Sequence, residues 1–311
     1  LKFIIFSKDV FDFLKKKATD DWDLWYYLKF LTKEKIIKVK KTGAPILIEK
    51  KLLKLIPKPK SKEEIVLLIE KKVKRKIREK EPINFLFGRE KIEKNLDQLP
   101  ISQGSVLFLV EKILERIPLF GKFLFVGDDD FVSLALSLAE PKISSLVVDL
   151  DEDLLSKISD FAKKFNLKIE TKKANVTKKT KFNDYFVGFL TNPVYTEEGV
   201  KEFLDFGIFQ LSDDGGVVFL EFGDEAIGNR LLFLEEFFAK KRLLLREAIL
   251  GKIFYPKILL HKEDKIISKR FQKIIKASKN YPRLSATLFI FDYLPFKINK
   301  VNFKKPIIAY L

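Results

Sequence analysis

Three adjacent aspartates, Asp128, Asp129 and Asp130, follow a short apolar run and a single glycine, Gly127. The surrounding sequence, FLFVGDDDFVSLAL (123–136), passes from a strand-like run to a helix-like pattern at these carboxylates. Clustered carboxylates attract cations, repel anions and raise one another's pKa, so one of them can act as a base toward an amine. Aspartate also favours helix starts, but that interpretation accounts for one or two of the three.

A second group of acidic residues follows the next strand-like run, in VVDLDED (147–153). An acidic residue about twenty residues after the glycine turn can accept hydrogen bonds from two ribose hydroxyls. Asp149 is the best candidate for this contact and Asp151 is the next, although Asp151 could instead cap the following helix. Asn175, at the end of the third strand, is a weaker candidate for contact with an adenine edge.

The single glycine limits which nucleoside fits. A site for a dinucleotide or for S-adenosylmethionine usually has several glycines here, whose N–H groups face a phosphate or a carboxylate. Only Gly127 is present, followed by carboxylates that repel an anionic tail. Decarboxylated S-adenosylmethionine, which carries a sulfonium and a primary ammonium, suits the stretch better. The acceptor of the reaction is then expected to be cationic too.

The turn TNPVY (191–195) follows the fourth strand-like run. Pro193 makes this turn rigid and restricts the residue before it. The turn is expected to place the Asn192 amide and the Tyr195 ring over the site, where they can hold an amine by hydrogen bonding and cation–π contact. A plain turn is the alternative interpretation.

The elements that must position these residues alternate between strands and helices. Near-continuous apolar strands separated by helices are typical of parallel βαβ units, so we predict an α/β fold with a doubly wound, Rossmann-like sheet of the methyltransferase type. Ligands of such sheets bind beyond the carboxyl ends of the strands. The late strands are expected to close the sheet antiparallel. The predicted strands are 121–127, 143–150, 167–176, 185–193, 215–223, 249–260 and 285–294, and the predicted helices are 105–117, 131–140, 151–166, 196–211 and 225–242.

The chain is predicted to have two domains. Residues 1–80 contain short helical segments broken by glycine and proline, which suits a small winged-helix-like N-terminal domain, and residues 81–104 connect it to the Rossmann-like domain at 105–311. Ser61 and Glu64 predict a capping box before an apolar run. Because no recognition helix stands out, a packing or dimerisation role for the N-terminal domain is preferred over nucleic-acid binding.

Composition narrows the chemistry. Cysteine is absent, which excludes disulfides, thiolate catalysis and cysteine-ligated zinc, and the one histidine, His261, rules out multi-histidine metal sites. No apolar run is long enough to cross a bilayer and no secretory pattern is seen, so we expect a cytoplasmic protein with no membrane contact. The net charge of +17 indicates either an affinity for anions or nucleic acid, or an organism whose proteins are generally basic. The high charge content without cysteine or methionine fits a heat-adapted organism or an AT-rich genome.

Four stretches taken together resemble the branched-chain polyamine synthases, or N(4)-bis(aminopropyl)spermidine synthases, of thermophilic archaea and bacteria. The resemblance implies a winged-helix-like domain before a Rossmann-like catalytic domain, in a homodimer. It also implies aminopropyl transfer from decarboxylated S-adenosylmethionine to the secondary amine of spermidine, with release of methylthioadenosine. We expect no permanently bound cofactor, and no metal is required because the sulfonium of the donor is already a good leaving group. The stretches are LDQLPIS (96–102), FVGDDDFVSLALSL (125–138), LVVDLDEDLL (146–155) and TNPVYTEEGVKEFLDFGI (191–208).

The resemblance also assigns roles to residues. The aspartates of its GDDD motif correspond to Asp128, Asp129 and Asp130, and Asp129 is expected to lie nearest the reactive nitrogen. In the mechanism that we expect, a carboxylate of this motif orients the amine and takes its proton. Gly127 and Gln98 are predicted to contact the nucleoside.

The chain departs from the family at the turn after the fourth strand. Asn192 stands where aspartate is common, and Val194 stands where a second proline is common. The loss of a carboxylate there could weaken polyamine binding or change which amine is accepted.

Two other functions remain open from the sequence. A methyltransferase that uses S-adenosylmethionine to modify an exocyclic amine of a nucleic acid would use Asn192, Pro193 and Tyr195 in a similar way, with phosphates bound by the basic surface. A nucleic-acid-binding regulator with a degenerate Rossmann-like domain is the third reading.

Overall fold

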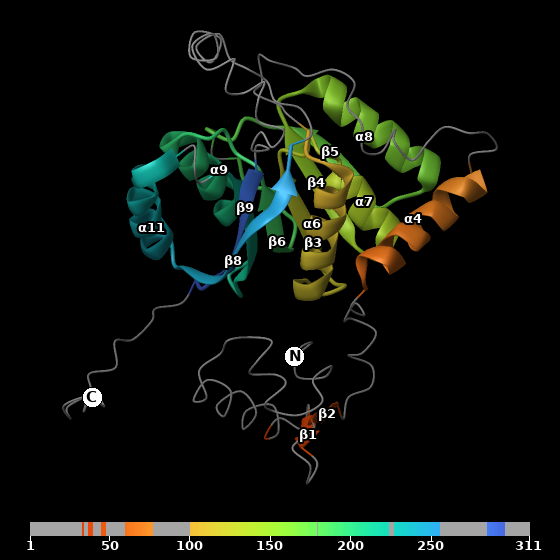
Figure 1. The fold of residues 1–311 in the computed structure, drawn as a ribbon, viewed down its shortest axis with the longest axis horizontal. Coiled ribbons are helices and arrows are strands. Elements are labelled where there is room, and N and C mark those ends of the chain that lie inside the picture. Colours follow the sequence, from red (N-terminus) through yellow and green to blue (C-terminus); the bar gives the residue numbers. More distant parts are fainter. Residues whose placement is uncertain are drawn as a thin grey trace, which may run out of the picture.

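The computed structural model describes residues 33, 37–39, 45–47, 60–76, 100–178, 180–223, 227–255 and 285–295. Their main feature is a seven-stranded sheet of order β5-β4-β3-β6-β7-β9-β8 (Figure 1). Strands β3 to β7 are parallel, and β9 pairs antiparallel with both β7 and β8. The strands are β3 (Lys122–Val126), β4 (Ser144–Asp149), β5 (Ile169–Lys173), β6 (Phe186–Thr191), β7 (Gly216–Phe222), β8 (Leu243–Phe254) and β9 (Ser285–Tyr293).

This order confirms the predicted Rossmann-like sheet of the methyltransferase type, including its antiparallel closure. The chain builds β3, β4 and β5 in one direction and then returns to the other side of β3 for β6 and β7. The topological switch point therefore lies between β3 and β6, where ligands of doubly wound sheets bind. Strands β3 and β6 are buried on both faces, which explains their near-continuous apolar sequences.

Helices cover both faces of the sheet (Figure 1). On one face, α4, α6, α7 and α8 share one apolar core, and on the other α9 and α11 pack over a second core. None of the helices in the described ranges is long and apolar enough to cross a membrane. The helices are α4 (Lys62–Lys76), α6 (Gln103–Arg116), α7 (Val132–Ala139), α8 (Glu152–Phe165), α9 (Glu197–Gln210) and α11 (Leu231–Lys240), preceded by the 3-10 turn η3 (Gly228–Arg230).

The predicted start of one strand was wrong. The pattern placed it at 249–260, whereas β8 spans Leu243–Phe254 and begins six residues earlier. The pairing of β8 with β9 shifts register twice, between Leu245 and Glu247 and between Ile249 and Ile253. These irregularities break the alternation of apolar and polar residues from which a strand is recognised.

The part of the N-terminal region that is described contains a small hairpin and helix α4. Strands β1 (Ile37–Val39) and β2 (Pro45–Leu47) pair antiparallel; the rest of the predicted winged-helix-like domain lies outside the described residues. The predicted capping box at the start of α4 is confirmed, because the Ser61 N–H donates to Glu64 at 2.9 Å and the Glu64 N–H donates to Ser61 Oγ at 3.2 Å.

Helix α4 packs on the Rossmann-like core although it falls within the predicted N-terminal domain. Its apolar residues Ile65, Ile69 and Val73 are buried in the same cluster as α6 and α7. At its start, the Lys60 ammonium pairs with Glu140 at the end of α7, with 2.8 Å between Nζ and Oε2. The domain boundary near residue 80 stays a prediction, and α4 extends the core on this face of the sheet.

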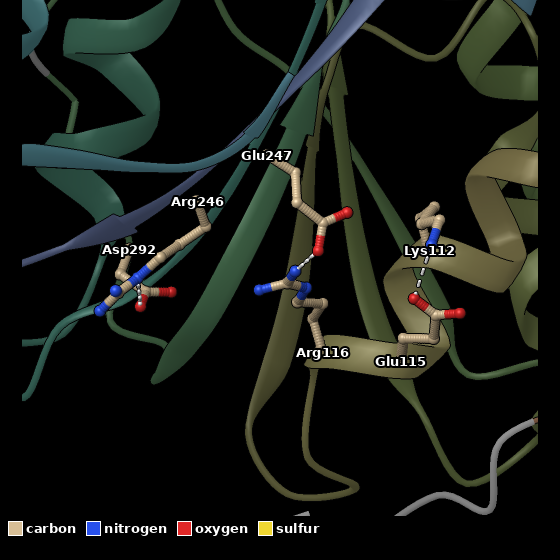
Figure 2. A network of polar contacts seen from close by, with 6 residues as sticks. All are labelled: Lys112, Glu115, Arg116, Arg246, Glu247 and Asp292. Carbon is tan, nitrogen blue, oxygen red and sulfur yellow. Dashed lines mark hydrogen bonds and ion pairs between the residues drawn. The ribbon is translucent and has the colours of Figure 1, made fainter. Parts of the chain in front are cut away.

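Ion pairs tie α6 to the antiparallel edge of the sheet. Figure 2 shows the Arg116 guanidinium, at the end of α6, paired with Glu247 of β8. The Arg116 side chain is only 3% exposed, whereas that of Glu247 is 31% exposed. A neighbouring pair, Arg246 Nε to Asp292 Oδ2 at 2.7 Å, joins β8 to β9. These contacts hold the edge strand, whose far end enters the site described below.

We predict that Glu247→Gln lowers the free energy of unfolding by about 2 kcal/mol, because the buried Arg116 guanidinium loses its carboxylate partner. The matched control is Glu236→Gln, which breaks the exposed pair between Lys240 and Glu236 on α11. The control should cost far less, because ion pairs in contact with solvent contribute little to stability. Urea unfolding of the two variants measures both values, and equal losses would contradict the assignment of Glu247 as the stabilising partner.

Candidate active site

The carboxyl ends of three adjacent strands bring the predicted stretches together. Val126 at the end of β3 pairs with Thr191 at the end of β6, and Thr191 pairs with Leu220 near the end of β7. The residues that follow in each strand are therefore neighbours at one edge of the sheet. The GDDD and TNPVY stretches, which are far apart in sequence, meet there as predicted, and a glutamate of β7, Glu221, joins them.

The turn after β3 is held in an unusual backbone conformation. Gly127 has a φ of 78° and its N–H donates to the Val148 carbonyl at 2.9 Å. Phe131 at the end of the turn also has a left-handed φ, 56°, which costs a non-glycine residue about 1 kcal/mol. Burial of the Phe131 side chain in the core holds this conformation. Such strained residues cluster at functional sites.

Asp128 is buried beneath the turn and begins helix α7. Both of its carboxylate oxygens lie 3.3 Å from the Ser133 nitrogen, whose N–H donates to them. The N-cap residue, Phe131, makes no side-chain hydrogen bond to the helix, so Asp128 supplies the acceptor that the N-cap residue lacks. Burial raises the pKa of Asp128 well above its usual value, hydrogen bonds from Ser133 oppose this rise, and the Asp129 charge adds to it. These contacts support the helix-start interpretation for this one aspartate, and its catalytic role stays a prediction.

Asp130 is also buried and connects the turn to the segment before α6. Its Oδ1 accepts the Ile101 N–H at 2.7 Å. Burial raises its pKa well above the usual range, the charge of Glu221 raises it further, and a hydrogen bond with the Asn192 side chain lowers it. Asp130 therefore lies within reach of both other strand ends.

Asp129 is the most exposed of the three aspartates, at the half-buried level. Its charge raises the pKa of Asp128, of Glu221 and of Tyr195, so its carboxylate lies close to all three. Asp129 is thus the member of the cluster that combines access with proximity to the other strand ends. This placement agrees with its prediction as the residue nearest the reactive atoms, which stays untested.

Glu221 is a site residue that the sequence analysis missed. Its side chain is buried, and burial, followed by the charge of Asp129, raises its pKa from 4.5 to about 8, while a hydrogen bond from Tyr255 opposes the rise. The signal was a single glutamate in the otherwise apolar strand GVVFLEF. Glutamate is almost never fully buried without a partner, so this position alone could have marked a functional carboxyl.

Two tyrosine hydroxyls complete the cluster. The Tyr195 hydroxyl contacts the hydroxyl of Tyr255, which follows β8 and was also missed. The Tyr255 oxygen lies 3.4 Å from Glu221 Oε1 and 3.5 Å from Asn192 Nδ2. Burial raises the pKa of both tyrosines well above 10, and the charge of Glu221 raises it further. Both hydroxyls therefore stay neutral at physiological pH.

The residues predicted to contact the nucleoside differ in how close they lie to this cluster. Asp149 is half-buried at the end of β4, and its Oδ2 would be 4.0 Å from a Cβ built on Gly127. Asp151 caps α8 by accepting the Leu154 N–H at 3.0 Å, which confirms the helix-cap interpretation. The Asn175 side chain accepts from both the N–H and the hydroxyl of Thr177, in a turn two strands away from β3.

The remaining predicted residues fall into two groups. Pro193 is buried in the turn after β6, next to Asn192, and Tyr195 packs its ring against Gly223 after β7. Gln98 and His261 lie outside the described residues. Within the described ranges no three acidic or histidine side chains are arranged to hold a metal ion.

Comparison with known proteins agrees with these features. Residues 84–233 match the family model described as the branched-chain polyamine synthase A C-terminal domain. An uncharacterized protein of Methanocaldococcus jannaschii is 32% identical over 142 residues, which cover 45% of this chain and 36% of that protein. The N(4)-bis(aminopropyl)spermidine synthase of the same organism is 36% identical over 122 residues, which cover 38% of this chain and 35% of that enzyme. The matched segment thus spans little more than a third of either relative.

The fold is also similar to that of a solved structure. The branched-chain polyamine synthase of Thermus thermophilus, in complex with N4-aminopropylspermidine and 5'-methylthioadenosine, superposes with a TM-score of 0.56. The similarity covers 93% of this chain and 84% of that one, at 15% sequence identity. At this identity the comparison supports the shared architecture.

Proposed function

We propose that the chain is an aminopropyltransferase of the branched-chain polyamine synthase family, whose C-terminal domain model matches residues 84–233. The proposed donor is decarboxylated S-adenosylmethionine, the acceptor is the secondary amine of spermidine, and the products are a branched polyamine and methylthioadenosine. The observation that carries the proposal is the gathering of Asp128, Asp129 and Asp130 after β3 with Glu221 near the end of β7, in a chain whose net charge is +17.

The donor is proposed to lie over Gly127. Asp149 accepts hydrogen bonds from the ribose hydroxyls, as an acidic residue at the end of the second strand does in nucleoside sites. A side chain at position 127 would point toward this carboxylate, so glycine leaves the space open. The sulfonium and the ammonium of the donor then extend toward the aspartates, where their charges are favourable.

The acceptor is proposed to lie between the turn after β3 and the turn after β6. The Asp129 carboxylate holds the amine, and the Tyr195 ring offers a π-face to the remaining positive charge of the polyamine. Glu221 supplies a carboxyl on the neighbouring strand, close to the position where Asn192 stands in place of the family's common aspartate. A carboxyl from β7 can thus take over part of the attraction that Asn192 lacks.

The reaction is a direct displacement at carbon. The nitrogen lone pair attacks the propyl carbon bonded to the sulfonium, the carbon–sulfur bond breaks, and its electron pair stays on the sulfur of methylthioadenosine. The enzyme contributes by fixing both cations in line and by shielding them from water, which together account for much of such rate accelerations. The sulfonium is itself a good leaving group.

The experiment that tests this proposal is mass spectrometry of spermidine incubated with decarboxylated S-adenosylmethionine and the protein. We expect mass gains of aminopropyl units on spermidine and an equal amount of methylthioadenosine. Parallel incubations with intact S-adenosylmethionine and RNA or DNA test the methyltransferase alternative. Methyl transfer to nucleic acid without any aminopropyl product would contradict the proposal.

A further inference from the structure

The hydroxyls of Tyr195 and Tyr255 form a continuous polar chain that ends at the Glu221 carboxyl. We infer that this chain relays the proton of the acceptor amine from Tyr195 through Tyr255 to Glu221, so that the base of the reaction is a residue of β7. The inference rests on the proposed aminopropyl transfer and adds the destination of the proton, which the turn aspartates were predicted to receive. Tyr255 lies outside the segment that matches the family model.

The contacts of Tyr255 fix the direction of the relay. A tyrosine hydroxyl has one proton to donate and can accept two hydrogen bonds. Asn192 Nδ2 can only donate to it, at 3.5 Å, and an ionised Glu221 can only accept from it, at 3.4 Å. The Tyr195 hydroxyl must then donate to Tyr255, and its own oxygen is left to accept the proton of a substrate. Catalytic hydrogen bonds of this length commonly shorten in the substrate complex.

The position of Tyr255 is set by hydrogen bonds between the backbone of the preceding residue, Phe254, and the start of α6. The Phe254 N–H donates to Ser105 Oγ at 2.9 Å, and the Phe254 carbonyl accepts the Ser102 N–H at 2.7 Å. Because the neighbouring Ile101 N–H bonds Asp130, the same segment fixes both the aspartate turn and the tyrosine. The relay is therefore built on rigid elements, as precise proton transfer requires.

The chemistry of the four carboxyls explains why Glu221 is the proton acceptor. Asp128 and Asp130 already accept backbone N–H groups, of Ser133 in α7 and of Ile101 before α6 respectively. Glu221 is faced by Asp129 and Asp130 from the turn after β3, by Tyr195 after β6 and by Tyr255 after β8. Burial and the Asp129 charge bring its pKa to about 8, a value suited to accepting a proton from an amine near neutral pH.

The proposed step balances. The N–H bond of the acceptor ammonium breaks and its proton goes to the Tyr195 oxygen, while the Tyr195 proton passes to Tyr255 and the Tyr255 proton passes to Glu221. Both tyrosines end as neutral phenols, the amine becomes neutral with a free lone pair, and Glu221 becomes a neutral acid. The lone pair then attacks the donor carbon, and Glu221 returns its proton to solvent before the next turnover.

The test compares the pH dependence of kcat in Tyr255→Phe, Tyr195→Phe and Glu221→Gln with that of the unsubstituted protein. Because Glu221 must be ionised to accept the proton, kcat of the unsubstituted protein should fall as the pH drops through about 8. Tyr255→Phe and Tyr195→Phe should each lose about 100-fold in kcat, with less than threefold change in KM. Glu221→Gln should lose at least as much in kcat and should also raise KM, because it removes a carboxyl that attracts the polyamine. In all three variants kcat should no longer fall as the pH drops through about 8. Tyr185→Phe is the matched control, because its exposed hydroxyl also donates to a carboxylate, that of Asp214.

Two further measurements make the result decisive. Combining Tyr255→Phe with Glu221→Gln should be no worse than Glu221→Gln alone, since both act on one relay. Difference infrared spectroscopy should show a tyrosine band that follows the titration of the Glu221 carboxyl and is lost in Tyr255→Phe. Additive losses, an unchanged fall of kcat with pH in Tyr255→Phe, or independent infrared titrations would overturn the relay. Absence of any aminopropyl product would instead overturn the proposed function, and the infrared titration still decides the coupling of Tyr255 to Glu221.

Discussion

Asp129→Asn is expected to lower kcat/KM for aminopropyl transfer by about 100-fold or more, the loss expected when a group that positions a reactant is removed. The substitution keeps the shape of the side chain and removes its charge, so the amine loses the carboxylate that holds it. It also removes a charge that raises the pKa of Glu221. The pH below which the remaining kcat falls should therefore move below about 8.

The fold should tolerate this change. Asp129 is half-buried, and the hydrogen bonds that fix the turn are made by Asp128 and Asp130. Asp160→Asn, on the exposed face of α8, is the matched control and should leave kcat/KM unchanged. Steady-state kinetics and urea unfolding of both variants separate the effects. An Asp129→Asn enzyme with activity within threefold of the unsubstituted protein would remove Asp129 from the proposed site.

Sequence patterns predicted the sheet and the meeting of the GDDD and TNPVY stretches because these depend on local signals. Apolar runs, glycine and proline turns and helix periods mark the parallel strands, and parallel strands bring their carboxyl ends to one edge. The capping role of Asp151 was likewise foreseen as one of two alternatives, because a cap depends on residues only a few positions away.

Glu221 and Tyr255 could not be placed in the same way. Glu221 lies in the site because β7 is the neighbour of β6 in the sheet. The order of strands in a sheet cannot be predicted from the local pattern of apolar residues. Tyr255 follows the end of β8, an edge strand with two register shifts. Because the predicted strand ran on to residue 260, the sequence placed Tyr255 inside the strand and gave no sign that it lies in the site. For Asp128 the sequence suggested a catalytic role together with its two neighbours. In the structure its carboxylate accepts the Ser133 N–H and so helps to begin helix α7.

Ligand selectivity is the second large effect that we expect. A carboxylate on the donor tail would lie beside Asp129 and its buried neighbours, and like charges placed together in an interface cost several kcal/mol. About 3 kcal/mol corresponds to a difference of roughly 100-fold in affinity. Decarboxylated S-adenosylmethionine should therefore bind at least about 100-fold more tightly than the intact molecule, although both present the same adenosine to Asp149. In Asp129→Asn the difference should narrow, because one of the repelling charges is gone.

Isothermal titration of the protein with these two ligands, at the same pH and ionic strength, measures the selectivity directly. We predict tight binding of the decarboxylated molecule and weak binding of the intact one. Equal affinities, or tighter binding of intact S-adenosylmethionine, would show that the carboxyl cluster at the ends of β3 and β7 does not select a cationic donor.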